Sequence, residues 1–212
     1  MNVVYLVRHG ENPANITREF SHRRVDYPLT ARGVAQARQT AAYFRDQAID
    51  SIYSSPLRRA QQTADIIATA LHLPVTILED FRETNVGTLE DQPPTAAAWE
   101  QHDSVLASWS SGQREVAFPG GEDYHSLLAR MRAGMATVLA GRDGARVVIV
   151  GHGGIFSATI LDLCANAAEF VWFGQNWPNC GISVLELHPG DELASTPRAR
   201  LRGWLDATHL SA

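Results

Sequence analysis

The chain opens with the stretch Val3-Val4-Tyr5-Leu6-Val7-Arg8-His9-Gly10. Its first five residues are apolar or aromatic and mostly β-favouring, which predicts a short strand that is buried on both faces. The strand delivers Arg8 and His9 at its carboxyl end, where ligands bind in open α/β sheets. Gly10 permits a sharp turn and a close approach of a ligand to the backbone. We therefore expect a central strand with a functional site at its end.

A second stretch, 146–151, repeats this pattern as Arg-Val-Val-Ile-Val-Gly and is followed by His152-Gly153-Gly154. A helix is expected from Ile155 to Cys164. Backbone N–H groups at the start of such a helix form an anion site. The two stretches together predict two histidines, each at the end of a buried strand.

Further elements follow from local patterns. Residues 11–27 are polar and aperiodic and predict a loop. Pro56 suits the first turn of a helix, where its missing N–H costs nothing. The other expected elements are a helix capped by Thr30 and ending near Gln47, strands over 49–54 and 75–78, a helix over 124–139, a strand over 182–187 near an edge, and a last strand within 201–210.

Two arginines fall at the start of the helix that follows Pro56. Cations there are disfavoured by about 0.3–1 kcal/mol, because the helix N-terminus carries partial positive charge. A nearby anion would offset this cost. Arg59 directly precedes Ala60 on the apolar side, so we expect Arg59 to point inward and Arg58 to face solvent.

Composition bounds the function. The chain has 212 residues, 45% hydrophobic and 19% charged, which is typical of a folded globular protein, and we expect a single domain over 1–212. The net charge of −5 disfavours a nucleic-acid partner, which needs a basic face. A local basic pocket for a small anion stays compatible with that charge.

The cellular setting is also expected from sequence. The chain shows no charged leader with an apolar core and no apolar run long enough for a bilayer, so we expect a cytoplasmic protein without a membrane partner. Cys164 and Cys180 form no CxxC pair and are expected to be reduced. The sequence does not fix the oligomeric state; a homodimer is compatible with it.

Residues from about 88 to 123 lack a clear period and predict a small inserted cap with short helices. Two tryptophans lie within it, Trp99 and Trp109. They either line the mouth of a substrate site or anchor the cap, and the sequence leaves both interpretations open.

If the strands are parallel, their charged ends meet at one edge. Fixed guanidinium, imidazole and amide donors suit a phosphoryl group, whose oxygens they can bind while charge spreads over them. Without a serine or cysteine nearby, a histidine itself can be the nucleophile. Glu83 is the acid expected to protonate the leaving group. The candidate catalytic and phosphate-binding residues are Arg8, His9, Asn15, Arg59, Glu83, His152 and Gly153.

Zinc is the competing use of two histidines. Zinc sites usually need three protein ligands, and the sequence has no HExxH or Cys/His spacing, while the arginines would repel a dication. A P-loop is absent as well. We therefore do not expect a catalytic metal.

These segments resemble the histidine phosphatase superfamily, the phosphoglycerate-mutase-like proteins. The matching blocks, in family order, are Leu6-Val7-Arg8-His9-Gly10-Glu11 with Asn15, Asp26-Tyr27-Pro28-Leu29-Thr30 with Gly33, Ser54-Ser55-Pro56-Leu57-Arg58-Arg59-Ala60, Arg82-Glu83 with Gly87, Val150-Gly151-His152-Gly153-Gly154, and Thr208-His209-Leu210. They span nearly the whole chain.

The resemblance implies an α/β three-layer sandwich with a mostly parallel central sheet, helices on both faces and a cap insertion at about 88–123. It also implies phosphoryl transfer through a phosphohistidine on His9. Arg8, Arg59, His152 and Asn15 would hold the phosphate, with Glu83 as proton donor and then base for water. No metal or cofactor is implied.

Several positions depart from the family pattern outside the phosphate group. They are Ala14 in place of tryptophan, Leu89-Glu90-Asp91, Gly121-Glu122-Asp123, and Ile155-Phe156 where an arginine is common. None of these positions belongs to the phosphate-binding group, so the expected reaction is unchanged. They do prevent the substrate from being inferred from the resemblance.

The resemblance leaves three functions to separate. Family mutases carry a longer insert before the second histidine and a tail after the last strand, whereas only Ser211 and Ala212 follow Leu210 here. We therefore expect a phosphatase acting on a small phosphate monoester. The alternatives are mutase-type transfer and a non-catalytic phospho-ligand binding protein, although all of the core residues are present.

Overall fold

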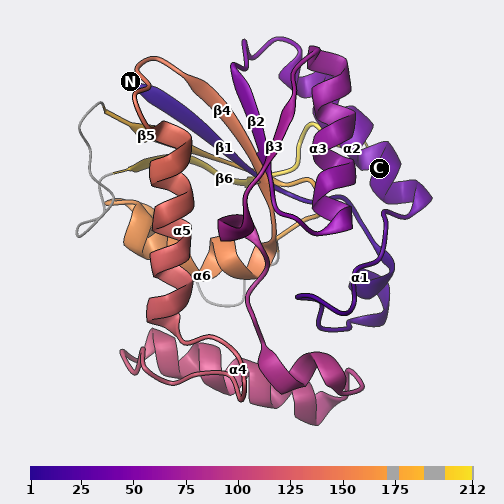
Figure 1. Cartoon of the computed structure of the whole chain (residues 1–212), viewed down its shortest axis with the longest axis vertical. Coiled ribbons are helices and arrows are strands. Elements are labelled where there is room, and N and C mark those ends of the chain that lie inside the picture. The colour runs from indigo at the N-terminus through magenta and orange to yellow at the C-terminus, as the bar shows by residue number, and fades with distance from the viewer. Residues whose placement is uncertain (171–176, 189–198, 212) are drawn as a thin grey trace.

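The computed structural model describes residues 1–170, 177–188 and 199–211. In this part of the chain a six-stranded sheet is flanked by helices (Figure 1). The strands are β1 (Asn2–Arg8), β2 (Ser51–Ser54), β3 (Val75–Ile77), β4 (Arg146–Gly151), β5 (Ile182–Leu187) and β6 (Arg200–Asp206). The α-helices are α1 (Pro13–Thr17), α2 (Ala31–Phe44), α3 (Arg58–Leu71), α4 (Ala96–Ser110), α5 (Tyr124–Leu139) and α6 (Gly153–Leu163). Short 3₁₀ helices are η1 (Glu79–Phe81), η2 (Gly87–Asp91) and η3 (Ala167–Glu169).

The sheet has the order β3-β2-β4-β1-β5-β6. The first four strands in this order are mutually parallel, and β5 runs antiparallel to β1. β6 pairs antiparallel with β5 and forms the edge, so β5 lies one position inside it. The expected mostly parallel α/β fold is therefore confirmed.

Successive side chains of the central strands point to opposite faces of the sheet, so each face has its own hydrophobic core. On β1, Val4 and Leu6 pack into the core that also holds residues of α5 and α6. Tyr5 and Val7 face the other core, which contains residues of α2 and α3. Helices thus cover both faces of the sheet, which makes three layers (Figure 1). Double-sided burial explains why β1 and β4 read as continuous apolar runs.

Two local expectations are wrong. Residues 11–27 are not all loop, because α1 forms there with a capping box in which the side chains and backbones of Asn12 and Asn15 bond reciprocally. Pro56 does not lie in the first helical turn: α3 begins at Arg58 with Leu57 as its N-cap. Ser55 and Pro56 instead form the turn between β2 and α3, and this turn carries a functional contact described below.

The cap is built differently from the short helices that were expected. Its main element, α4, has 15 residues and is capped by the hydroxyl of Thr95. Only Ala98, Val105 and Trp109 are buried along it, so most of the helix faces solvent and gives a weak apolar pattern. None of the helices in the described part of the chain is long and apolar enough to cross a bilayer.

Candidate active site

The carboxyl ends of β1 and β4 place two histidines side by side. Arg8 lies opposite Gly151 in the parallel register, so the residues that follow both strands leave at the same edge. The rings of His9 and His152 have centroids 5.2 Å apart and are tilted by 56°. Segments far apart in the sequence therefore bring two buried imidazoles together.

His9 has a defined protonation pattern. Its Nδ1 lies 2.7 Å from the carbonyl oxygen of Gly10, which can only accept, so Nδ1 carries the hydrogen. Its Nε2 accepts a hydrogen bond from Arg59 Nε at 3.1 Å. Burial, together with the charges of Arg59 and Arg8, holds the pKa of His9 well below its usual value. At neutral pH His9 is thus a neutral imidazole whose Nε2 carries no proton and holds the hydrogen bond from Arg59.

Arg59 comes from the first turn of α3 and is only 2% exposed. One terminal nitrogen donates to the carbonyl of Ser21 at 2.7 Å, and the other lies 3.9 Å from the carboxylate of Asp26. Burial lowers the pKa of Arg59 to about 10, so the side chain stays cationic at neutral pH. The predicted inward orientation of Arg59 is confirmed.

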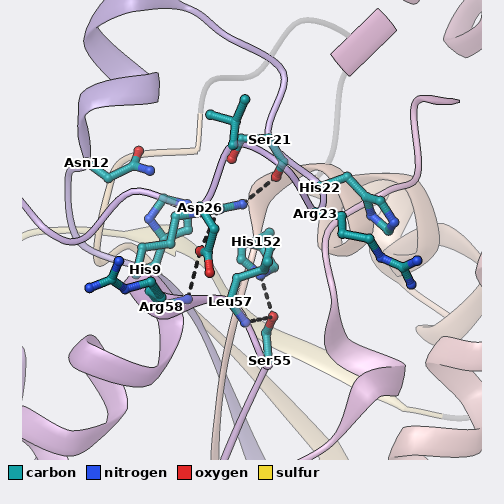
Figure 2. A network of polar contacts seen from close by, with 12 residues as sticks. His9, Asn12, Ser21, His22, Arg23, Asp26, Ser55, Leu57, Arg58 and His152 are labelled. Carbon is teal, nitrogen blue, oxygen red and sulfur yellow. Dashed lines mark hydrogen bonds and ion pairs between the residues drawn. The ribbon is translucent and has the colours of Figure 1, made fainter. Parts of the chain in front are cut away.

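Asp26 supplies the anion that the first turn of α3 needs. Its carboxylate accepts the backbone N–H of Arg58 at 2.8 Å, while the side chain of Arg58 is exposed (Figure 2). The Asp26 carboxylate therefore accepts a backbone N–H at the N-terminus of α3 and also lies near the buried guanidinium of Arg59.

Arg8 is held by a different segment of the chain from the one that holds Arg59. One terminal nitrogen donates to the carbonyl of Trp177, while Nε is buried without a hydrogen-bond partner in the described part of the chain. Burial lowers the pKa of Arg8, and the charge of Glu83 partly offsets that effect. Arg8 and Arg59 thus approach His9 from two different elements.

Ser55 fixes the tautomer of His152. Ser55 Oγ accepts the backbone N–H of Leu57 at 3.3 Å and lies 2.7 Å from His152 Nε2 (Figure 2). Among the described residues the hydroxyl hydrogen has no acceptor other than this nitrogen, so we infer that the hydroxyl donates to Nε2. Nε2 then accepts, and the proton of the neutral ring lies on Nδ1. Burial, then the charge of Arg59, keeps the pKa of His152 well below its usual value. His152 therefore offers a buried N–H donor beside His9.

We expect Ser55→Ala to lower kcat about a hundredfold, the typical cost of losing one fixed donor to the reacting group. Without the hydroxyl, His152 can protonate Nε2 instead, and Nδ1 becomes an acceptor. The matched control is Ser54→Ala, which removes the adjacent buried hydroxyl that bonds only to the carbonyl of Ser55. Kinetics combined with ¹⁵N chemical shifts of His152 would check this; an unchanged tautomer would contradict it.

The buried histidines also predict acid sensitivity of the fold. Their folded pKa values lie below the unfolded value of about 6.5, so below that pH the unfolded chain takes up protons first. Each group should then cost about 1.4 kcal/mol of stability per pH unit, down to its folded pKa. Urea unfolding at pH 5, 6 and 7 would measure the slope. His9→Asn and His152→Asn should each flatten it, and equal slopes in all three proteins would contradict the prediction.

Glu83 reaches the site from the loop after β3 and η1. One oxygen of its carboxylate accepts the N–H groups of Thr84 at 2.7 Å and Ile155 at 2.9 Å. The other oxygen, Oε2, accepts the N–H of Gly154 at 3.1 Å. The carboxylate thus lies at the N-terminus of α6. An added Cβ at Gly154 would lie 2.5 Å from Glu83 Oε1, so glycine is needed for this position of the carboxylate.

The backbone of Glu83 is fixed as well. Its carbonyl accepts hydrogen bonds from His22 Nδ1 at 2.8 Å and from Arg130 at 3.1 Å. Arg130 also donates to the carbonyl of Arg82 and pairs with the carboxylate of Glu122. Because Glu122 lies at the end of the cap segment, the cap and the Glu83 loop share one network.

A cavity of about 480 Å³ opens above these groups. Asn15 and Gly153 line it, as do Arg8, His9, Arg59 and Glu83; His152 is fully buried against His9 and does not. The side-chain oxygen of Asn15 accepts from Asn12 N and Asn179 Nδ2, which leaves its NH₂ group for a ligand. The structure thus brings all of the predicted site residues together.

The two tryptophans of the cap have different places. Trp99 lines the cavity, whereas Trp109 is buried beneath α4 and donates to the carbonyl of Val116. Both interpretations of the sequence hold, one for each residue.

The basic run 22–24 lies outside the cavity lining. The backbone N–H groups of four consecutive residues, His22 to Val25, all donate to one oxygen of Glu90, at 2.7 to 3.2 Å. Arg23 and Arg24 are exposed. Their charge is therefore part of a surface loop, while the loop backbone is held by the cap.

A model of the histidine phosphatase superfamily (branch 1) matches residues 4–197. The chain belongs to this superfamily. A probable phosphoglycerate mutase, GpmB, of Salmonella choleraesuis is 34% identical over 217 residues, 99% of this chain and 95% of the relative. An uncharacterized phosphatase, PhoE, of Bacillus subtilis is 33% identical over 169 residues, 80% of this chain and 81% of the relative. The solved mycobacterial glucosyl-3-phosphoglycerate phosphatase has a TM-score of 0.74 at 27% identity, covering 98% of this chain and all of that one.

Sequence reasoning missed several residues of the site in this superfamily member. Three of them lie within or next to the motifs given above: Ser55, Asp26 and Glu90. The sequence of a motif does not indicate which distant residues its side chains contact. Asn179 donates to the carbonyl of His9 at 3.1 Å and Arg130 lies far along the chain; both act through backbone carbonyls, which sequence does not reveal.

Proposed function

We propose that this protein is a phosphomonoesterase that hydrolyses a small phosphorylated metabolite through a phosphohistidine on His9. The supporting observation is a set of unsatisfied donors. In the part of the chain that the structure describes, Arg8 Nε, Arg59 Nη1 and His152 Nδ1 are buried without a hydrogen-bond partner. Each such group costs about 1–3 kcal/mol. Three of them around one imidazole fit an oxyanion with several acceptor oxygens, as a phosphoryl group has.

In the first step, Arg59 Nε–H turns from His9 Nε2 to a phosphate oxygen, Nε2 attacks phosphorus, and the bond from phosphorus to the ester oxygen breaks. Glu83 gives a proton to the departing alcohol; Oε2, with a single N–H donor, has room for that proton. The Nδ1–H of His9 stays on the carbonyl of Gly10, which keeps the ring aligned. The guanidiniums stabilise the charge on the equatorial oxygens.

In the second step, Glu83 takes a proton from water, and the water oxygen attacks phosphorus. The bond from phosphorus to His9 Nε2 breaks, which releases inorganic phosphate and restores the neutral imidazole. Glu83 is again protonated for the next cycle.

Mutase-type transfer is the second candidate, because the relative named as a probable mutase is as similar as the one named as a phosphatase. Incubation with 3-phosphoglycerate in H₂¹⁸O separates the two reactions. We expect inorganic phosphate with one ¹⁸O atom and no 2-phosphoglycerate. Isomerisation without phosphate release would favour the mutase. Binding without either reaction, and without turnover of p-nitrophenyl phosphate, would favour a non-catalytic protein.

A further inference from the structure

The cavity has two chemically different sides. The floor carries the charged groups around His9. The loop after α1 and the helix α4 contribute an apolar and aromatic group, Phe20, Trp99, His102 and Leu106, together with the polar Arg18, Glu19 and Ser21. We define Phe20, Trp99 and His102 as the aromatic wall. Since the phosphate belongs at the floor, this wall is the surface that meets the rest of the substrate.

The rings of the wall pack together. Phe20 and Trp99 have centroids 4.4 Å apart, and His102 lies 5.4 Å from Phe20 and 5.1 Å from Trp99. Trp99 Nε1 already donates to the carbonyl of Arg18 at 3.1 Å, and His102 Nδ1 lies 2.9 Å from Asp103. These two atoms are thus engaged, so apart from Nε2 of His102 the wall offers ring surface to a ligand.

Arg18 completes the wall. Its guanidinium lies 5.0 Å over the ring of Trp99, and its backbone has a left-handed φ of 61°, which is uncommon outside glycine. The unusual conformation directs the carbonyl of Arg18 to Trp99 Nε1. A planar guanidinium on an aromatic face extends the stacking surface toward the cavity, which Arg18 also lines.

Beside the aromatic wall the lining holds one cation and one anion, Arg18 and Glu19. Arg8 and Arg59 face His9 and would be occupied by the phosphate. The remaining arginine of the lining, Arg18, lies over Trp99 and is followed by Glu19, which also lines the cavity. A phosphoglycerate-type substrate would have Arg18 for its carboxylate, next to the acidic side chain of Glu19. An uncharged, unsaturated ring needs only the surface that the wall provides.

We propose that the substrate is a phosphate monoester whose alcohol carries an aromatic or heteroaromatic ring, which packs on Trp99 and Phe20. This inference rests on the proposed function for the position of the phosphate. It identifies Trp99 as a specificity-determining residue. A phosphate ester of a saturated or hydroxylated alcohol cannot make these aromatic contacts, so its kcat/KM should be lower than that of an aryl-bearing ester.

Turnover is compared among phosphates of primary alcohols, so that the leaving groups have similar reactivity. The series is benzyl, 2-phenylethyl and 3-phenylpropyl phosphate, against 2-cyclohexylethyl phosphate, glycerol 3-phosphate and 3-phosphoglycerate. We expect kcat/KM for the best aryl member to exceed that for glycerol 3-phosphate at least about tenfold, and to exceed the cyclohexyl ester. Equal or better turnover of glycerol 3-phosphate or 3-phosphoglycerate would overturn the inference.

Two tryptophans on α4 give a matched pair of variants. Trp99→Leu should reduce the preference for the aryl ester over glycerol 3-phosphate at least about threefold. Trp109→Leu, which alters a buried residue outside the cavity, should leave that ratio unchanged even if it lowers the Tm. Equal effects of the two substitutions on the ratio would contradict a role for Trp99 in specificity.

Calorimetric binding of the same esters to His9→Ala separates this inference from the proposed reaction. Preferential binding of aryl esters, without turnover by the natural sequence, would keep the ring site and overturn the hydrolase. Turnover without any aryl preference in binding would keep the hydrolase and overturn the ring site. Absence of both would overturn both.

Discussion

His9→Ala is expected to reduce turnover of any phosphate monoester by at least about 10⁴-fold, as removal of a nucleophile does in other covalent enzymes. The variant removes Nε2, the ring nitrogen that accepts a hydrogen bond from Arg59. In the described site, His9 is the histidine of this pair that lines the cavity. It should also abolish an acid-labile, alkali-stable phosphoenzyme that forms when labelled substrate is mixed with the natural sequence and quenched.

Mapping the label by mass spectrometry makes this test specific. The phosphoryl group should be found on the peptide that contains His9 and not on the peptide that contains His152. The control is His125→Ala on α5, an exposed histidine far from the cavity lining. Label on His152, or undiminished turnover by His9→Ala, would exclude His9 as the nucleophile.

The second large effect is expected from Gly154→Ala. The new methyl would lie 2.5 Å from Glu83 Oε1, so the carboxylate must leave its place at the start of α6. Loss of a positioned proton donor costs about 10²- to 10⁴-fold. The loss should be near 10²-fold or more with alkyl phosphates and much smaller with p-nitrophenyl phosphate, whose leaving group needs no proton. Glu83→Gln should show the same dependence on the leaving group.

Gly153→Ala is the steric control for this prediction. A Cβ at Gly153 would meet Trp177 at 3.4 Å and Arg8 at 3.6 Å or more, which are ordinary contacts, and its N–H is retained. We expect a far smaller loss than at Gly154, without dependence on the leaving group. Circular dichroism and Tm of both variants would show that the fold is kept. Equal losses on alkyl and aryl phosphates for Gly154→Ala would contradict the role of Glu83 as acid.

Strong local patterns allowed much of the fold to be predicted. The strand over 146–151 and the helix over 124–139 have the predicted bounds, because both are long apolar or periodic segments buried in the core. The inward orientation of Arg59 followed from its place beside Ala60. Parallel pairing of β1 and β4 then accounts for the meeting of their terminal residues.

Other features depend on tertiary contacts that leave no local pattern. The helix α1 has five residues and is stabilised by the reciprocal bonds of Asn12 and Asn15 rather than by an apolar stripe. The start of α3 was misplaced because Ser55 and Pro56 serve the turn that reaches His152. Trp99 and Trp109 belong to the same helix, and the packing of α4 against the rest of the fold decides which of them lines the cavity and which is buried.

The anchoring of residues 22–25 by Glu90 has a consequence for protein engineering. The carbonyl of Ser21, which directs Arg59, immediately precedes this anchored segment, so a carboxylate of the cap helps to shape the catalytic floor. A chimera that receives a foreign cap would lose this tether unless the transplanted piece brings an equivalent of Glu90. Exchange of substrate preference between relatives therefore requires a crossover point that keeps the N-terminal loop and the beginning of the cap as one inherited block.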